Sequence, residues 1–275
     1  MKPSYSLFSS KVLFTPLLLL LSFSLYSVST NAADSEMDVN NIIAKANSVS
    51  YYNADDGKAQ ARMIIVDAQG NKQMRQFTIL RKDQKELGDQ NMLVIFSRPT
   101  DVEGTVFSVN KKINDDDDRW LYLPALDLVK RISAGDKRTS FVGSHFLYED
   151  VSGRNPKEDT FTLVKTTDKY YVIKAIPNDP NSVEFAHYEI KIDKTTFLPV
   201  EVNYYNSNNE NTRRMEVLKT KLIDGFTTVL HSKITQLSDG SYTEMQFRKV
   251  EYNLGFPDSI FSERSLRNPP KAWLQ

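Results

Sequence analysis

The 275-residue sequence has no cysteine, only three histidines and no excess of either charge, since 35 lysine and arginine residues balance 35 aspartate and glutamate residues. The absence of cysteine excludes disulfides, thiolate metal sites, cysteine nucleophiles and a lipid-modified amino-terminal cysteine. The charge balance argues against a nucleic-acid binder, because phosphate binding needs a basic surplus or a basic stripe. Aromatic residues are plentiful, with 15 Phe, 13 Tyr and 2 Trp. With an apolar fraction of only 40%, this composition favours a large curved sheet that leaves one face wet.

The sequence also lacks long apolar runs, except for one near the amino terminus. Two lysines and no acid accompany the apolar stretch Val12–Tyr26, and small residues follow it. This order is typical of a secretory signal peptide, so we expect residues 1–33 to be removed by cleavage after Ala32 or Ala33; the alternative is an uncleaved anchor. No later stretch approaches the roughly 20 apolar residues of a transmembrane helix. We therefore expect residues 34–275 to form one exported domain, with 33 basic and 35 acidic residues.

The pattern of the exported part predicts one short helix followed by many β-strands. Residues 38–48 carry apolar side chains at helical spacing. From Ala59 onward the period is two, and turns containing Asn, Asp, Gly or Pro recur about every 8–12 residues, which predicts an antiparallel sheet. A short helix is expected at Pro257–Ser265. Because no linker rich in Pro, Gly or Ser is present, the chain reads as one mainly β (α+β) domain.

One predicted strand, Arg119–Ala125, is apolar on both faces. Trp120 and Tyr122 alternate in it with two leucines. A strand with two apolar faces should be covered by another part of the protein. The aromatic-rich piece Phe141–Val151 is the candidate cover, as a short helix or a lid. Either the aromatic pair or the leucine pair would then face an apolar ligand.

Several cations accompany this strand. They are expected either to form a docking rim for anionic head groups or an acidic partner, or to be ordinary surface charges over a core strand. The five residues of the expected rim are Arg119, Lys130, Arg131, Lys137 and Arg138.

No sequence pattern indicates catalysis or a metal site. The acidic run Asp115–Asp118 lacks the glycine and the distal glutamate of a calcium loop, so we interpret it as a solvated hairpin tip. The three histidines occur without a nucleophile elbow or a zinc-protease motif. A triad assembled from distant residues stays possible, and His145 is then the best candidate for a hydrolase of envelope lipids. We expect a binding protein rather than an enzyme, with no cofactor and no metal ion.

Several segments, spread over nearly the whole exported chain, carry a resemblance to a known family. The central motif is DDRWLYLPAL at Asp117–Leu126, and it continues as KRI at Lys130–Ile132 and as SFVGSHFLYED at Ser140–Asp150. Supporting segments are Phe96–Thr105, Asp193–Pro199 and Phe256–Phe261. Together they resemble the outer membrane lipoprotein-sorting proteins, a family similar to the LolA and LolB carriers and to the lipid-sensing domain of the regulator RseB.

This resemblance implies a half-open antiparallel β-barrel, with a few short helices that form a plug or lid over an apolar cavity. It also implies a periplasmic carrier that binds the acyl chains of lipoproteins or lipids and delivers them toward the outer membrane, with only transient membrane contact. The alternative is a lipid-sensing or accessory subunit of a membrane exporter or envelope regulator. The residues expected in the cavity or lid are Trp120, Leu121, Tyr122, Leu123, Phe141, Phe146, Leu147 and Tyr148.

Overall fold

One antiparallel sheet of thirteen strands makes up most of the computed structural model, which describes residues 1, 37–85 and 87–274. The strands are β1 (Asp56–Val66), β2 (Lys72–Asp83), β3 (Gln90–Arg98), β4 (Val106–Lys111), β5 (Asp118–Leu123), β6 (Leu128–Ile132), β7 (Asp159–Thr166), β8 (Tyr170–Pro177), β9 (His187–Asp193), β10 (Pro199–Tyr205), β11 (Asn211–Ile223), β12 (Phe226–Gln236) and β13 (Tyr242–Tyr252). Residues 2–33 of the expected signal peptide lie outside the described residues.

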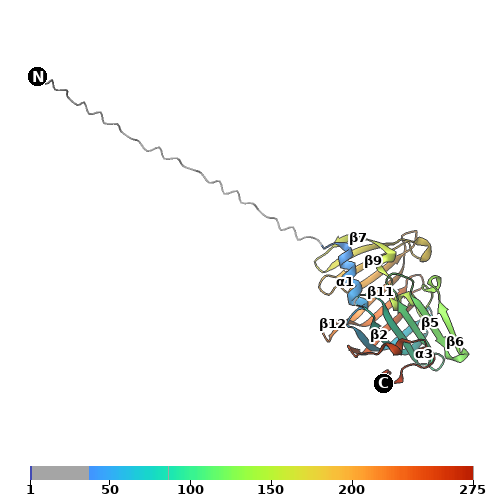
Figure 1. Cartoon of the computed structure of the whole chain (residues 1–275). Helices are drawn as coiled ribbons and strands as arrows, with labels where there is room; N and C mark the ends of the chain where they lie inside the picture. Colours follow the sequence, from blue (N-terminus) through green and yellow to red (C-terminus); the bar gives the residue numbers. More distant parts are fainter. Residues whose placement is uncertain (2–36, 86, 275) are drawn as a thin grey trace. The chain divides into compact units, whose positions relative to one another are not determined.

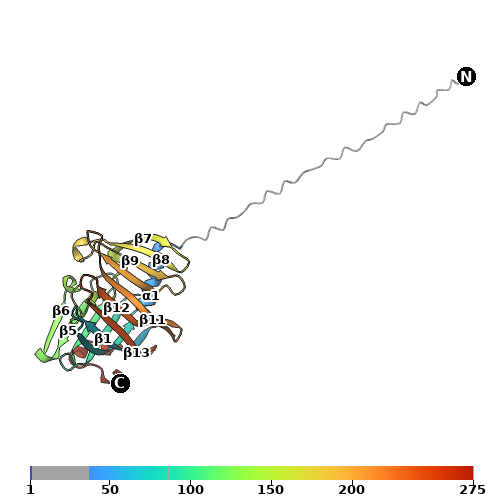
Figure 2. The same cartoon turned by 180° about the vertical axis from the view of Figure 1, so that it is seen from behind.

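The strands pair in the order β6-β5-β4-β3-β2-β1-β13-β12-β11-β10-β9-β8-β7. In the described part of the chain the two edge strands, β6 and β7, do not pair with each other. The sheet therefore curves without closing (Figures 1 and 2). This confirms the expected open antiparallel barrel.

The helices are few and short. They are α1 (Val39–Tyr51), α2 (Tyr148–Ser152) and α3 (Arg264–Arg267), with 3-10 turns η1 (Pro124–Leu126), η2 (Ala134–Asp136), η3 (Pro156–Glu158), η4 (Pro180–Ser182), η5 (Asp258–Phe261) and η6 (Lys271–Trp273). α1 corresponds to the helix expected at residues 38–48, although the side chain of Asp38 forms no capping hydrogen bond. The helix expected at Pro257–Ser265 is replaced by η5 and α3. No helix among the described residues is long and apolar enough to cross a membrane.

The segment that joins the two edge strands fills one half of the concave face. We call residues 133–158, which run from β6 to β7, the plug segment. Phe141 of the plug segment is fully buried, and its ring lies 5.5–6.3 Å from the rings of four other aromatic residues. These rings belong to Phe77, Phe96, Phe107 and Tyr148. The plug segment is thus the centre of a core shared with β1–β6, β12 and β13.

Helix α1 covers the other half of the concave face. Ile42, Ile43 and Ala46 are spaced at one helical face and are buried against β8, β9 and β10. Figure 1 shows α1 (blue) extending from β7 toward β2.

We call residues 253–274, which follow β13, the carboxyl-terminal segment; it covers the convex face of β2–β5. Leu93 and Ile95 point to this side of β3, whereas their neighbours Met92 and Val94 point to the plug segment, as the period of two requires. The segment is held at its start by Asp56, which accepts hydrogen bonds from the backbone N–H groups of Leu254 (2.6 Å) and Phe256 (2.7 Å).

Candidate functional site

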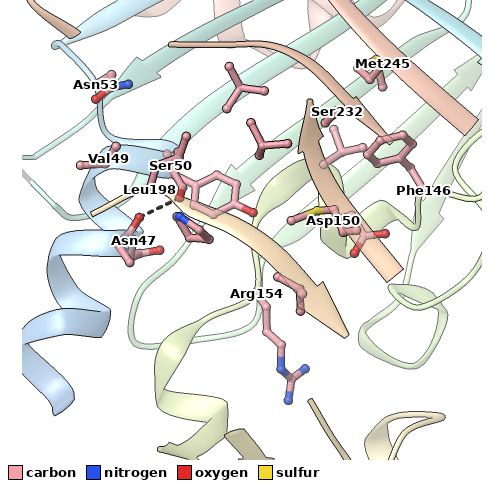
Figure 3. Close-up of a pocket in the computed structure, with 18 of the residues that line it drawn as sticks. Asn47, Val49, Ser50, Asn53, Phe146, Asp150, Arg154, Leu198, Ser232 and Met245 are labelled. Carbon is pink, nitrogen blue, oxygen red and sulfur yellow. Dashed lines mark hydrogen bonds between the residues drawn. The ribbon is translucent and has the colours of Figure 1, made fainter. Parts of the chain in front are cut away.

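An apolar cavity of about 430 Å³ lies between the concave face of the sheet, α1 and the plug segment. This volume is within the roughly 300–1,000 Å³ of small-molecule sites. Figure 3 shows residues of the α1 region on one side of the cavity, with Phe146 and Met245 opposite. The apolar wall includes Ile43, Ala46, Val49, Ile79, Met92, Phe141, Phe146, Ile190, Val202, Met215, Val217, Val229, Met245, Phe247 and Val250.

The charged part of the wall is organised around one carboxylate. Glu149 is only 1% exposed, and its oxygens lie 2.8 Å from Arg138, 3.0 Å from Lys137 and 3.2 Å from Arg154. Burial alone would raise the pKa of Glu149, but the charges of Arg138, Arg154 and Lys137 outweigh it and lower the pKa below its usual value. Glu149 is therefore ionised at neutral pH.

Two of these cations and one further ion pair tie the plug segment to β7, to the loop before β9 and to β11. Arg154 donates to Asp159 at the start of β7 (2.7 Å), and Arg138 pairs with Glu184 just before β9. Asp150 of the plug segment pairs with Arg213 of β11. Because these groups, apart from the half-exposed Glu184, are largely buried, removing one partner would leave its counterpart desolvated without a matching charge. These ion pairs thus hold the plug segment in place beside the cavity.

Only some of the eight residues expected in the cavity or lid border the cavity. Phe141 and Phe146 line the cavity. Tyr148 packs behind them in the core, and Leu147 is the partly buried residue before α2. These two residues do not line the cavity.

The two-sided strand β5 is covered on both faces, and neither face reaches the cavity. Leu121 and Leu123 face the plug segment, as part of its core. Trp120 and Tyr122 point to the convex face, where they pack with the carboxyl-terminal segment. The expected cover at Phe141–Val151 therefore accounts for one face only. None of the four side chains lines the cavity.

The five cations of the expected rim do not form one exposed surface. Lys130 is exposed, and Arg131 is a surface residue that pairs with Asp118 and lies over the ring of Trp120. In contrast, Arg119 is buried beside Asp117, and Lys137 and Arg138 belong to the buried network around Glu149. A run of cations and polar residues looks like surface in the sequence, but Asp117 pairs with Arg119, and the buried Glu149 pairs with both Lys137 and Arg138.

His145 lies in the plug segment but does not line the cavity. Its backbone N–H and its Nδ1 contact the Thr243 hydroxyl (3.1 and 2.8 Å), and its Nε2 contacts Ser241 Oγ (2.9 Å). Ser241 in turn donates to Asp239 (2.6 Å), so the acid orients the serine and not the imidazole, unlike a catalytic triad. Burial lowers the pKa of His145, which favours a neutral ring. These contacts anchor the plug segment to β13.

No cluster of metal-ligating side chains is found in the described ranges, 37–85 and 87–274. The acidic run Asp115–Asp118 is divided between a solvent-exposed loop and ion pairs. Asp115 and Asp116 are exposed, whereas Asp117 pairs with Arg119 and Asp118 pairs with Lys112.

Sequence reasoning missed most of the cavity wall, which comes from α1 and β9–β13. The sequence of β10 does contain a pattern that indicates part of this wall. Val202 and Tyr204 alternate there with polar residues, and both line the cavity. Ile43, Ala46 and Val49 also follow helical spacing. What the pattern could not indicate is that these two faces lie opposite each other.

The open antiparallel barrel with an internal plug places the chain in the LolA-like fold class. The chain belongs to the family whose model, described as a "-like" uncharacterized protein, matches residues 88–268. A comparison with curated proteins finds no match.

Two solved structures share 26% sequence identity with this chain. One is a DUF1329 family protein from Desulfovibrio piger (TM-score 0.74), and the alignment covers 82% of this chain and 96% of that one. The other is a putative outer membrane lipoprotein-sorting protein domain from Vibrio parahaemolyticus (TM-score 0.75), with 82% and 97% coverage. A LolA superfamily protein from Nitrosomonas europaea, at 16% identity and a TM-score of 0.62, covers 82% of this chain and 97% of its own, and it supports the fold alone. The expected resemblance to lipoprotein-sorting proteins is confirmed.

Proposed function

We propose that this protein is a carrier that binds the acyl chains of lipoproteins or lipids in its cavity and releases them to an acceptor. The observation that carries the proposal is the apolar cavity of about 430 Å³ between the sheet, α1 and the plug segment. The similarity to a lipoprotein-sorting domain over most of the chain supports the same role.

The energetics of an acyl chain in water explain why a carrier needs such a cavity. Exposing a chain costs roughly 0.8 kcal/mol per CH₂, so a chain of ~16 carbons costs on the order of 12 kcal/mol. A cavity wall dominated by Ile, Val, Met and Phe removes most of this cost. The arrangement needs no bond-making group and no cofactor, so we propose a carrier rather than an enzyme.

The proposed setting is the periplasm. The amino-terminal segment has the composition of a cleaved signal peptide, and residues 34–275 would form the exported carrier domain. The partner would be an outer-membrane acceptor or a membrane exporter, with only transient contact with the membrane.

The test is binding of a fluorescent 16-carbon acyl probe to variants of the cavity wall. Val49 of α1 is half-buried and lines the cavity, so V49D places a carboxylate there, and we expect at least a tenfold loss of probe affinity. V164D is the matched control, because Val164 of β7 is 54% exposed outside the cavity. Equal binding by the wild type, V49D and V164D would refute cargo binding in this cavity.

A further inference from the structure

The sheet has a seam between β12 and β13. These strands pair only where His231–Thr235 lies opposite Tyr242–Gln246. Beyond this stretch β12 continues to pair with β11 as far as Phe226, and β13 continues to pair with β1 as far as Tyr252. Within the described residues, no ladder joins the remaining parts of β12 and β13 to each other.

Irregularities at the same level of neighbouring strands account for this separation. The β11–β12 register shifts on both sides of Lys219, and the β1–β13 register shifts between Lys58 and Gln60. Lys249, opposite that second shift, has a φ of 48°, in the left-handed region. Because β-bulges bend a strand and end its pairing on one side, they turn β13 away from β12 here.

The seam opens into the cavity. Residues from both of its sides belong to the cavity wall, namely Thr227, Thr228 and Val229 of β12 and Phe247, Val250 and Tyr252 of β13. The consecutive residues in β12 show that the edge of the strand, and not only one of its faces, borders the cavity.

Side-chain contacts hold the seam shut in place of a backbone ladder. The Tyr252 hydroxyl lies 2.9 Å from Thr228 Oγ1, and the Tyr252 ring lies 5.0 Å from the ring of Phe226. Asn53, just after α1, donates from Nδ2 to the backbone carbonyl of Thr227 (3.1 Å) and so ties β12 to the α1 region rather than to β13. The two contacts across the seam break at a much smaller cost than a continuous ladder of hydrogen bonds.

Exposed leucines and cations lie on the two strands that flank β12, namely β11 and, across the seam, β13. Leu218 is 48% exposed and Leu222 is 67% exposed, both on β11. We define the seam rim as these two leucines with four exposed cations, which form no ion pair among the described residues: Lys219, Lys221, Arg248 and Lys249. The one acid at the hairpin tip is Asp224. The rim is therefore positive on a chain whose exported part is negative overall.

We propose that the seam is the opening through which an acyl chain enters and leaves the cavity, and that the seam rim docks on an anionic lipid surface. The inference rests on the proposed carrier function. Apolar side chains among lysines at an exposed hairpin fit the interface of an anionic bilayer, where the cations meet head groups and the leucines enter the acyl boundary. Docking there brings the opening to the lipid that supplies or receives cargo.

The docking test measures co-sedimentation of the protein with vesicles of phosphatidylglycerol and phosphatidylcholine at low salt. The double variant K219E/K221E should bind at least 30-fold more weakly, as the contribution of two cations near an anionic surface predicts. K130E/R131E makes the same change of charge on the distant β6 and should bind like the wild type. Wild-type affinity of K219E/K221E, or an equal loss in both variants, would overturn the docking surface; the second result would indicate a response to net charge or a different surface.

The opening is tested separately with the soluble acyl probe, in stopped-flow experiments without vesicles. Y252F removes the hydrogen bond to Thr228, so both association and dissociation should accelerate about fivefold. Y122F, which loses a hydroxyl contact on the convex face, is the control. Unchanged rates in Y252F would refute the seam as the opening. Failure of the wild type to bind the probe at all would instead refute the carrier function.

Discussion

Replacing Phe141 by alanine tests whether the plug segment is a structural core or a loosely placed lid. Phe141 is fully buried and contacts four aromatic rings, so truncation removes a large apolar side chain and those contacts together. Such substitutions cost about 3–5 kcal/mol of unfolding free energy. Because Phe141 also borders the existing cavity, the void can merge with it, and we expect about 4 kcal/mol.

The assay is urea unfolding followed by tryptophan fluorescence. With an m-value of about 3 kcal/mol/M, the midpoint of F141A should fall by about 1.3 M. F141L keeps most of the volume and should lose only about 1.5 kcal/mol. F141A should also bind a longer acyl probe better than the wild type does, since its cavity is larger. A loss below 1 kcal/mol in F141A would contradict the packing of the plug segment described above.

Two further predictions concern buried carboxylates. E149Q should lose about 3 kcal/mol, since three cations lose a buried partner. Because the pKa of Glu149 is lowered in the folded protein, its contribution to the free energy of unfolding is complete above the unfolded-state pKa of about 4.3 and is lost as the pH falls through the folded-state pKa. The stability of E149Q should therefore fall less steeply than that of the wild type below about pH 4. An unchanged pH profile would contradict this role of Glu149. D56N leaves one of the two amides of Leu254 and Phe256 unpaired, which should cost about 2 kcal/mol and speed hydrogen exchange in the carboxyl-terminal segment, whereas unaltered exchange would contradict the role of Asp56.

The class of the fold was predictable from local patterns, because a period of two and recurrent turns report directly on strands. Phe141 and Phe146 were expected in the cavity or lid because their segment is rich in aromatic residues, and both border the cavity. Which face of β5 packs against the plug segment was not predictable, because both faces, represented by Trp120 and Leu121, are apolar. Only the carboxyl-terminal segment, more than 100 residues later, decides which of them meets the plug segment.

The ion pairs around Glu149 were also not predictable from the sequence. Lys137 and Arg138 stand in a polar stretch and look like surface cations, yet both are largely buried and form ion pairs with Glu149, and Arg138 also pairs with Glu184. The seam was also hidden, because Lys249 gives no sequence signal for a left-handed backbone. Pairing between distant segments, which single-sequence patterns do not encode, determines both features.

The central claim is that the cavity carries an acyl chain. Mass spectrometry of the protein purified from a periplasmic extract without detergent tests it most directly, with V49D purified in parallel. We predict that an acylated molecule copurifies with the wild type and is depleted in V49D. A wild-type protein that carries no acylated species, and takes none up when incubated with lipid or lipoprotein, would contradict the account.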